Sequence, residues 1–291
     1  MHARAAAALT SVAGSVVIGV LVLPTAAQAA PANDRTVVVA HRGASAYAPE
    51  NTLPAVDRAS ALGISWVEND VQRTRDGVLV VLHDTTLART TNVEQLYPNR
   101  SPWNVADFTS SELARLDAGS WKGAEYAGTR IPTLHEYLRR VDRNGQKLLM
   151  EIKAPELYPG IEDQILRQLR RDGWLDSWDV KHRLIIQSFN ADSVRTVHDR
   201  RPDIKTGFLG TPAVSELPKY AKFADQINPS HTTTSADYVK AVHALKGPHG
   251  KQLETYTWTV NDAQTAQKVA GFGVDGIISN APDVVRAAIG G

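Results

Sequence analysis

Short apolar segments with the character of buried strands alternate with segments of helical period along the chain after residue 35. This alternation predicts a parallel sheet covered by helices, because parallel neighbours need long crossover connections. Eight such strand segments are present, which is the strand number of a β/α barrel. The predicted strands are Val37–Ala40, Ser65–Gln72, Lys147–Ile152, Leu184–Ser188, Lys205–Leu209, Ala224–Ile227, Glu254–Val260 and Gly276–Ser279.

The predicted fold is therefore of the α/β class, a (β/α)8 TIM barrel. Helical periodicity occurs between the strands, for example over Ile161–Arg171, Ala191–Arg200, Ala236–Leu245 and Asp262–Ala270. An open doubly wound sheet is the alternative. The glycine fingerprint of its dinucleotide-binding version is missing from this sequence, which favours the barrel.

Two segments depart from the plain alternation. The residues Val78–Leu82 follow a turn and predict an additional strand that returns beside the second one. The connection of residues 84–131 is too long for a simple β/α loop and contains apolar residues such as Phe108 and Leu113. It predicts a small helical insertion after the second β unit, on the top face of the barrel.

The first predicted strand leads directly into a polar turn and then into a helix. His41, Arg42 and Gly43 follow the apolar run, and catalytic groups of parallel α/β proteins lie beyond the carboxyl ends of the strands. Either Asn51 or Thr52 is expected to cap the helix that ends near residue 63. This turn is the first place to look for reactive side chains.

Residues 1–29 have the composition of a signal peptide. They carry one basic residue, Arg4, no acidic residue, an apolar core at Val16–Leu23 and the small-residue sequence Ala27-Gln28-Ala29. A transmembrane anchor is the alternative, but this core is far shorter than the roughly 20 residues that span a bilayer. We therefore expect export, cleavage and release outside the cell, with residues 30–291 forming one barrel domain of about the usual ~250 residues.

Charge and cysteine content limit the possible partners. The formal net charge is +1 and becomes zero once the leader is removed, so bulk electrostatics favour neither nucleic acid nor an anionic membrane. The sequence has no cysteine, so disulfides do not stabilise an exported domain. We expect a small-molecule partner and no stable membrane anchor.

Polar residues fall at the carboxyl ends of the predicted strands, where a barrel would bring them together. Glu68 and Asp70 are two residues apart and therefore lie on the same face of their strand, as do Glu151 and Lys153. The set of candidate residues comprises His41, Arg42, Glu68, Asp70, His83, Asp84, Glu151, Lys153, Gln187, Asn228, Trp258 and Asn280.

These residue types indicate phosphate chemistry. Three carboxylates that share a pocket, Glu68, Asp70 and Glu151, repel one another unless a cation neutralises them, and an all-oxygen ligand set selects Ca²⁺ or Mg²⁺. Imidazoles supply an acid and a base near neutral pH. Arginine and lysine bind anions. Together they suit cleavage of a phosphodiester, in which a leaving alkoxide must be protonated.

Each candidate also has a structural interpretation. Glu68 and Asp70 could form ion pairs with an arginine such as Arg73, although carboxylates inside a strand are costly without a partner. Glu50 is either a residue near the helix start that the helix dipole favours, or a residue that contacts the metal or its bound water. Asp84 either orients His83 or is an ordinary turn residue.

The residues near the later strands are open to two interpretations as well. Lys153 could be only a salt-bridge partner of Glu151. Gln187 and Asn228 could serve only to fix loops, and Gln187 is a weak candidate for substrate contact. Trp258 is either core or an indole at the barrel mouth against which a substrate stacks.

Seven ordered segments between about Val37 and Asp283 form a recognisable series: HRGASAYAPENT, VENDVQ, DGVLVVLHD, EIK, QSF, YTWTVN and GVDGIISNAPD. With these segments the sequence resembles the glycerophosphodiester phosphodiesterase family, of the secreted bacterial type. This resemblance implies a β/α barrel that uses one divalent cation, Ca²⁺ or Mg²⁺, to hydrolyse glycerophosphodiesters to glycerol 3-phosphate and an alcohol. It further implies that His41 and His83 are the acid/base pair, that Glu68, Asp70 and Glu151 bind the metal, and that Arg42 and Lys153 bind the phosphate.

Two positions differ from the family pattern. Asn69 stands between two proposed ligands where an apolar residue is usual, and Asn280 stands in a Ser-Asn-Ala run where Thr-Asp-aromatic is more common. The sequence leaves open whether the nucleophile is water or the substrate's own glycerol hydroxyl, and which histidine is the acid. The alternative functions are a lysophospholipid-cleaving, phospholipase D-like enzyme and a non-catalytic barrel that binds glycerophosphate polymer.

Overall fold

The computed structural model describes residues 1–2 and 36–290, and the predicted signal peptide, residues 1–29, lies almost entirely outside them. The strands of the described residues form one sheet in the order β7-β6-β5-β4-β2-β1-β9-β8, with β3 paired to β2 alone. Their bounds are β1 (Val37–Ala40), β2 (Trp66–Arg73), β3 (Leu79–Val81), β4 (Lys147–Ile152), β5 (Leu184–Ser188), β6 (Lys205–Leu209), β7 (Gln226–Asn228), β8 (Tyr256–Thr257) and β9 (Gly276–Ser279).

This sheet is a nearly closed eight-stranded parallel barrel, which confirms the predicted fold class. Seven of its contacts are parallel ladders, and β3 is the antiparallel extra strand. The eighth contact, between β7 and β8, consists of two isolated parallel bridges, Gln226 to Glu254 and Ser230 to Trp258. The strand predicted over Glu254–Val260 is therefore too long, because only two of its residues belong to the ladder with β9.

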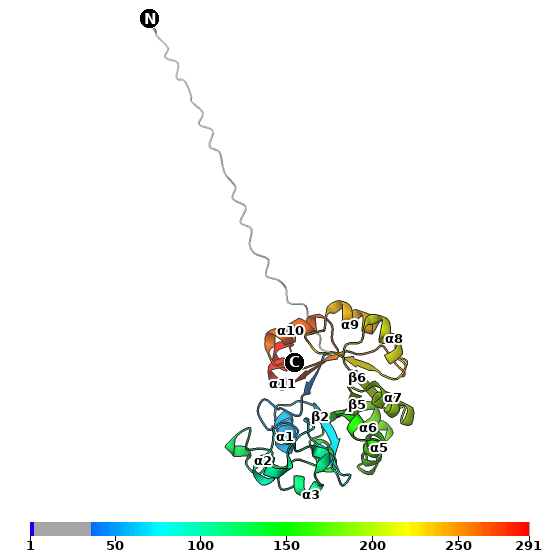
Figure 1. Ribbon diagram of the computed structural model, residues 1–291. Helices are drawn as coiled ribbons and strands as arrows, with labels where there is room; N and C mark the ends of the chain where they lie inside the picture. The colour runs from blue at the N-terminus through cyan, green and yellow to red at the C-terminus, as the bar shows by residue number, and fades with distance from the viewer. Residues whose placement is uncertain (3–35, 291) are drawn as a thin grey trace. The chain divides into compact units, whose positions relative to one another are not determined.

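Helices surround the strands in Figure 1 and cover the outer surface of the barrel. The main core lies between strands and helices, where Val67 of β2 and Leu148 of β4 pack with Leu134, Tyr137 and Leu138 of α4. The α-helices are α1 (Leu53–Ala61), α2 (Val93–Leu96), α3 (Ser110–Leu113), α4 (Leu134–Arg143), α5 (Ile161–Arg171), α6 (Ser177–His182), α7 (Ala191–Arg200), α8 (Leu217–Tyr220), α9 (Ala236–His243), α10 (Ala263–Gly271) and α11 (Pro282–Ala288).

Strand register brings the acidic residues together. Asp70 of β2 lies beside Glu151 of β4, and Glu151 lies beside Gln187 of β5. Because side chains two residues apart share a face, Glu68 points to the same side of β2 as Asp70. Asn69 points to the other side, where it is fully buried and its amide atoms have no hydrogen-bond partner among the described residues.

The segment between β3 and α4 contains only short helices. In addition to α2 and α3 it includes three 3-10 turns, η1 (Pro98–Arg100), η2 (Val105–Asp107) and η3 (Ala124–Tyr126). It has its own hydrophobic cluster, in which Leu87, Phe108 and Leu116 are fully buried. Two side chains fasten the segment to the loop after β1, since Lys122 Nζ donates to the Ser45 carbonyl and the Tyr126 hydroxyl donates to the Tyr47 carbonyl.

The loop after β1 differs from the sequence prediction at the start of α1. Thr52 is the N-cap residue by position, but its hydroxyl donates to the Pro49 carbonyl and makes no capping bond. Asn51 does not cap the helix either, because its amide donates to Asp70 Oδ2 at 2.8 Å. The predicted cap is therefore wrong, and Asn51 faces the acidic residues instead.

No helix of the described residues is long and apolar enough to cross a membrane.

We expect Gly43→Ala to destabilise the protein by about 2–4 kcal/mol. Gly43 has φ +77°, and a Cβ there would lie 2.6 Å from the backbone carbonyl carbon of Ala55, so both strain and a clash oppose the substitution. Gly77→Ala is the matched control, because Gly77 has φ +84° but nothing within 4 Å, and it should cost only about 1 kcal/mol. Urea unfolding measures the loss of unfolding free energy in both variants. Equal losses would show that the close approach of Gly43 to Ala55 of α1 does not contribute to the effect.

Candidate active site

A pocket of about 120 Å³ opens at the carboxyl ends of the strands. It brings together most of the residues predicted from the sequence, from strands that are far apart in the chain. Its walls are formed by His41, Arg42, Glu68, His83, Glu151, Lys153, Gln187, Phe189, Leu209, Trp258, Thr259 and Ile278.

Three buried carboxylates form the floor of this region. Glu68, Asp70 and Glu151 each offer one oxygen, and these oxygens all lie within 4.8 Å of one another. Their exposed fractions are 1%, 1% and 6%. Three negative charges this close and this dry cannot all persist without positive charge beside them.

Two basic side chains supply part of that charge. Arg42 Nε lies 3.4 Å from Asp70 Oδ2, and Lys153 Nζ lies 2.9 Å from Glu151 Oε1 and 3.6 Å from Asp70 Oδ1. Burial alone would raise the pKa of Asp70, but Arg42 and Lys153 outweigh it and leave this pKa below its ordinary value. The alternative interpretation, an ion pair with an arginine, holds for Asp70 through Arg42 and not through Arg73, which contacts Pro159 and Gln164 instead.

The other two carboxyls retain protons more readily. Burial, together with the nearby charges of Asp70 and Glu151, raises the pKa of Glu68 well above its ordinary value. Burial, followed by the effect of Asp70, raises the pKa of Glu151 to about 8. The two cations therefore do not fully neutralise the cluster.

The cluster fits a hard divalent cation. Its ligand atoms are all carboxylate oxygens, the type that Ca²⁺ and Mg²⁺ prefer. Asp70 Oδ1 is buried and accepts no hydrogen bond, so an oxygen that needs positive charge is left without a donor. Glu50 is not in this cluster, and both of its oxygens accept bonds from arginines.

Arg42 is held from three sides. Its backbone N–H donates to Glu68 Oε2 at 2.9 Å, its guanidinium donates to Glu50 Oε1 at 2.9 Å, and its carbonyl accepts from the Asn51 N–H. Arg42 and Asn51 have φ of 58° and 60°, a left-handed conformation that is costly outside glycine. Both strained residues direct side chains at Asp70, so the loop between them is shaped around this carboxylate.

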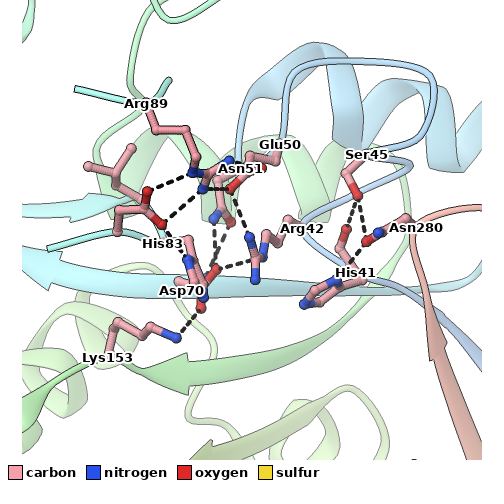
Figure 2. Close-up of polar contacts among 12 residues, drawn as sticks. His41, Arg42, Ser45, Glu50, Asn51, Asp70, His83, Arg89, Lys153 and Asn280 are labelled. Atoms are coloured by element: carbon pink, nitrogen blue, oxygen red, sulfur yellow. Dashed lines mark hydrogen bonds and ion pairs between the residues drawn. The ribbon is translucent and has the colours of Figure 1, made fainter. Parts of the chain in front are cut away.

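His41 is bound by an amide. Its Nδ1 lies 2.6 Å from Asn280 Oδ1, and since an amide oxygen has no proton to give, Nδ1 carries the hydrogen and Nε2 is free. Ser45 Oγ lies 2.9 Å from the same Asn280 oxygen, and Figure 2 shows the three residues grouped together. Burial, assisted by the positive charge of Arg42, lowers the pKa of His41 to about 4.

His83 has a carboxylate partner instead. Its Nδ1 lies 2.7 Å from Asp84 Oδ1, so Asp84 contacts the ring as the orienting interpretation requires. Gln72 fixes the backbone here, because its amide donates to the carbonyls of Leu82 and Asp84. Burial, followed by the charge of Arg42, lowers the pKa of His83, whereas the Asp70 and Asp84 carboxylates oppose this shift.

The part of the wall formed by Phe189, Leu209, Trp258 and Ile278 is less polar. Gln187 is buried and its Oε1 accepts from Asn228 Nδ2 at 2.9 Å, so these two amides tie β5 to β7. Trp258 donates its indole N–H to the Asn228 carbonyl, and its ring meets Phe189 edge to face with centroids 5.4 Å apart. Phe189 is 49% exposed and was not predicted as a site residue.

Sequence reasoning also missed contacts made by two residues. Asn280 was expected only as a polar residue at the end of the last strand and as a departure from the family pattern, and its contact with His41 was not predicted. Arg89, which lies in the long segment after β3, donates to both Asp84 and Glu50. No periodicity marks either residue, and only the folded contacts identify them.

Two solved structures that are similar to this chain are phosphodiesterases. A phosphodiesterase of Oleispira antarctica, in complex with the product sn-glycerol 3-phosphate, is 29% identical with a TM-score of 0.75, covering 88% of this chain and 97% of that one. A glycerophosphodiester phosphodiesterase of Agrobacterium tumefaciens is 26% identical with a TM-score of 0.67, covering 87% and 99%.

The chain belongs to the glycerophosphoryl diester phosphodiesterase family, whose model matches residues 41–284. A glycerophosphodiester phosphodiesterase of Caldanaerobacter subterraneus is 35% identical over 86% of this chain and 96% of the relative. One from Bacillus subtilis is 32% identical over 86% and 85%. The family depends on divalent cations, and the buried acidic cluster is present in this chain.

We expect binding of Ca²⁺ or Mg²⁺ to release protons and to weaken as the pH falls from 8 to 6. Glu151, with a pKa of about 8, is largely protonated below that pH in the cation-free protein, and a cation must displace its proton. The dissociation constant should rise by up to about tenfold per pH unit. Calorimetric titration in two buffers of different ionisation enthalpy measures the protons released.

Two variants complete this measurement. Glu151→Gln should remove most of the affinity and the part of its pH dependence that the Glu151 proton contributes. Glu254→Gln is the control, because Glu254 pairs with Lys205 outside the pocket and should leave binding unchanged. Equal affinities at pH 6 and pH 8 would contradict the assignment of Glu151 as a ligand.

Proposed function

We propose that this protein hydrolyses glycerophosphodiesters to glycerol 3-phosphate and an alcohol. The observation that carries the proposal is the meeting of two imidazoles, two basic side chains and an acidic cluster around one pocket. The relative from Oleispira antarctica holds sn-glycerol 3-phosphate, which supports the same product for this chain.

In this proposal the phosphate binds between the acidic cluster and the basic residues. Glu68, Asp70 and Glu151 hold one Ca²⁺ or Mg²⁺, which when bound supplies positive charge to the phosphoryl oxygens. Arg42 and Lys153 line the same pocket and bind those oxygens from the protein side. Glu50 accepts a hydrogen bond from the Arg42 guanidinium and so positions it, and Glu50 is not itself a metal ligand.

His41 and His83 exchange the protons. The nucleophile, water or the glycerol hydroxyl of the substrate, gives its proton to the free Nε2 of one ring as its oxygen bonds to phosphorus. The bond from phosphorus to the alcohol oxygen breaks, and the protonated Nε2 of the other ring gives that oxygen a proton. With the glycerol hydroxyl as nucleophile, a cyclic phosphate forms first and water then opens it by the same exchange in reverse.

The alcohol part of the substrate is expected to rest on the less polar wall. Trp258 and Phe189 present aromatic surface there, and aromatic rings suit both glycerol carbons and a cationic headgroup. Gln187 is bonded to Asn228, which supports a role in shaping this wall more than one in gripping substrate.

We also propose that the chain is exported and that its leader is cleaved after Ala29. The composition of residues 1–29 supports this. N-terminal sequencing of the protein recovered from culture medium tests it, and a mature chain that retains Arg4 would contradict it.

We expect glycerol 3-phosphate to be released from glycerophosphocholine in the presence of Ca²⁺ or Mg²⁺ and not in the presence of a chelator. His41→Ala and His83→Ala should each lower kcat at least ~100-fold, because general acid and base catalysis contributes about 10²–10⁴. An enzymatic assay for glycerol 3-phosphate, run with and without added cation, measures the product.

His135→Ala is the control for this experiment. His135 also has its Nδ1 against a carboxylate, Asp172, but it does not line the pocket, so activity should be unchanged. A wild-type protein that cleaves lysophosphatidylcholine and no glycerophosphodiester would replace the proposed substrate class with lysophospholipids. A protein that binds glycerophosphate polymer without any turnover would contradict the enzymatic proposal.

A further inference from the structure

Arg89 bridges two carboxylates that belong to different parts of the barrel mouth. Its Nε and Nη2 donate to the two oxygens of Asp84 at 2.6 and 2.9 Å. Its Nη1 and Nη2 donate to the two oxygens of Glu50 at 2.9 and 2.7 Å. Figure 2 shows this guanidinium next to Glu50, with a dashed line between them.

Each of these carboxylates also holds one side chain of the pocket. Asp84 Oδ1 contacts Nδ1 of His83, and Glu50 Oε1 accepts from Nη1 of Arg42. The contacts therefore run without interruption from His83 through Asp84, Arg89 and Glu50 to Arg42. At one end of this series of contacts, Glu50 and Arg42 belong to the loop between β1 and α1. At the other end, His83 and Asp84 follow β3.

We propose that Arg89 is a positioning residue that sets the distance and orientation between His83 and Arg42. The proposal rests on the proposed function, in which one of these side chains transfers a proton and the other binds the phosphate. A displacement of about 1 Å between groups that must act on one phosphate can cost about 10²-fold in rate. Arg89 touches neither the reacting atoms nor the pocket wall.

The geometry suits arginine and no other residue. A planar guanidinium offers five N–H donors in a fixed fork, and four such bonds are made here to two carboxylates. An ammonium group on a flexible stem cannot hold both carboxylates in defined orientations. The Arg89 bonds also lower the pKa of Asp84 to about 2, so this partner of His83 stays ionised over the working pH range.

Because Arg89 is partly exposed, a positioning role can be distinguished from a purely structural role by experiment. Its side chain is 45% exposed, and ion pairs between exposed side chains contribute little to folding stability. A purely structural role therefore predicts a small loss of stability and unchanged turnover. A positioning role predicts an equally small change in the melting temperature together with a large loss in kcat.

We expect Arg89→Ala to lower kcat for glycerophosphocholine by about 10–100-fold with KM changed by less than about 3-fold. Arg89→Lys should recover little of this loss. Arg201→Ala is the matched control, because Arg201 also forms a two-pronged pair, with Asp203 at 2.7 Å for both bonds, away from the pocket. This control should leave kcat unchanged.

A multiple-mutant cycle tests whether Arg89 acts through its two partners. Adding Arg89→Ala to the Glu50→Gln/Asp84→Asn double variant should lower kcat by less than about 2-fold, because the groups through which Arg89 acts are already altered. Losses that multiply independently would overturn the proposal. Wild-type kcat in Arg89→Ala would overturn it as well.

A spectroscopic measurement tests the positioning role of Arg89 without relying on turnover. The Nδ1–H of His83, assigned by its absence in His83→Ala, should give a protected ¹⁵N-coupled proton signal in the wild type. In Arg89→Ala this signal should exchange with solvent and broaden. If no glycerophosphodiester is cleaved but the signal changes as expected, the proposed function fails and the positioning role stands. An unchanged signal would overturn the positioning role whatever the activity.

Discussion

The repulsion among Glu68, Asp70 and Glu151 is the constraint on which the rest of this site depends. Parallel register between β2 and β4 places these carboxylates side by side, and burial removes the water that would screen them. Arg42 and Lys153 supply positive charge, yet two of the three carboxyls still have raised pKa values. A site of this kind is unfavourable for folding and is instead suited to a ligand that carries more positive charge than the side chains can bring.

The loop after β1 contains strained backbone next to the same carboxylate cluster. Arg42 and Asn51 adopt left-handed backbone conformations, which residues other than glycine rarely do, and both form hydrogen bonds to the cluster. Arg89 extends this arrangement outward by tying the loop to the end of β3. The long segment after β3 therefore contributes a contact at the back of the pocket as well as its own small core.

The fold and the members of the pocket could be predicted from the sequence because both follow from periodicity. Buried parallel strands are continuous apolar runs, and the polar residue after each run must reach the same mouth of a barrel. The contacts between pocket residues could not be predicted in this way. Whether Asn51 caps α1 or bonds Asp70 depends on a left-handed backbone angle that no residue pattern specifies, and the pairing of His41 with Asn280 joins residues at opposite ends of the chain.

The contact between β7 and β8 has fewer paired backbone residues than the ladder between β2 and β4, so the two sides of the pocket differ in their resistance to opening. On one side, β2 and β4 share a continuous ladder that carries the carboxylates. On the other, two isolated bridges and side-chain bonds from Asn228 and Trp258 close the barrel. Local unfolding starts where backbone pairing is sparse. Backbone amides beside the aromatic wall should accordingly exchange with solvent sooner than those beneath the carboxylates.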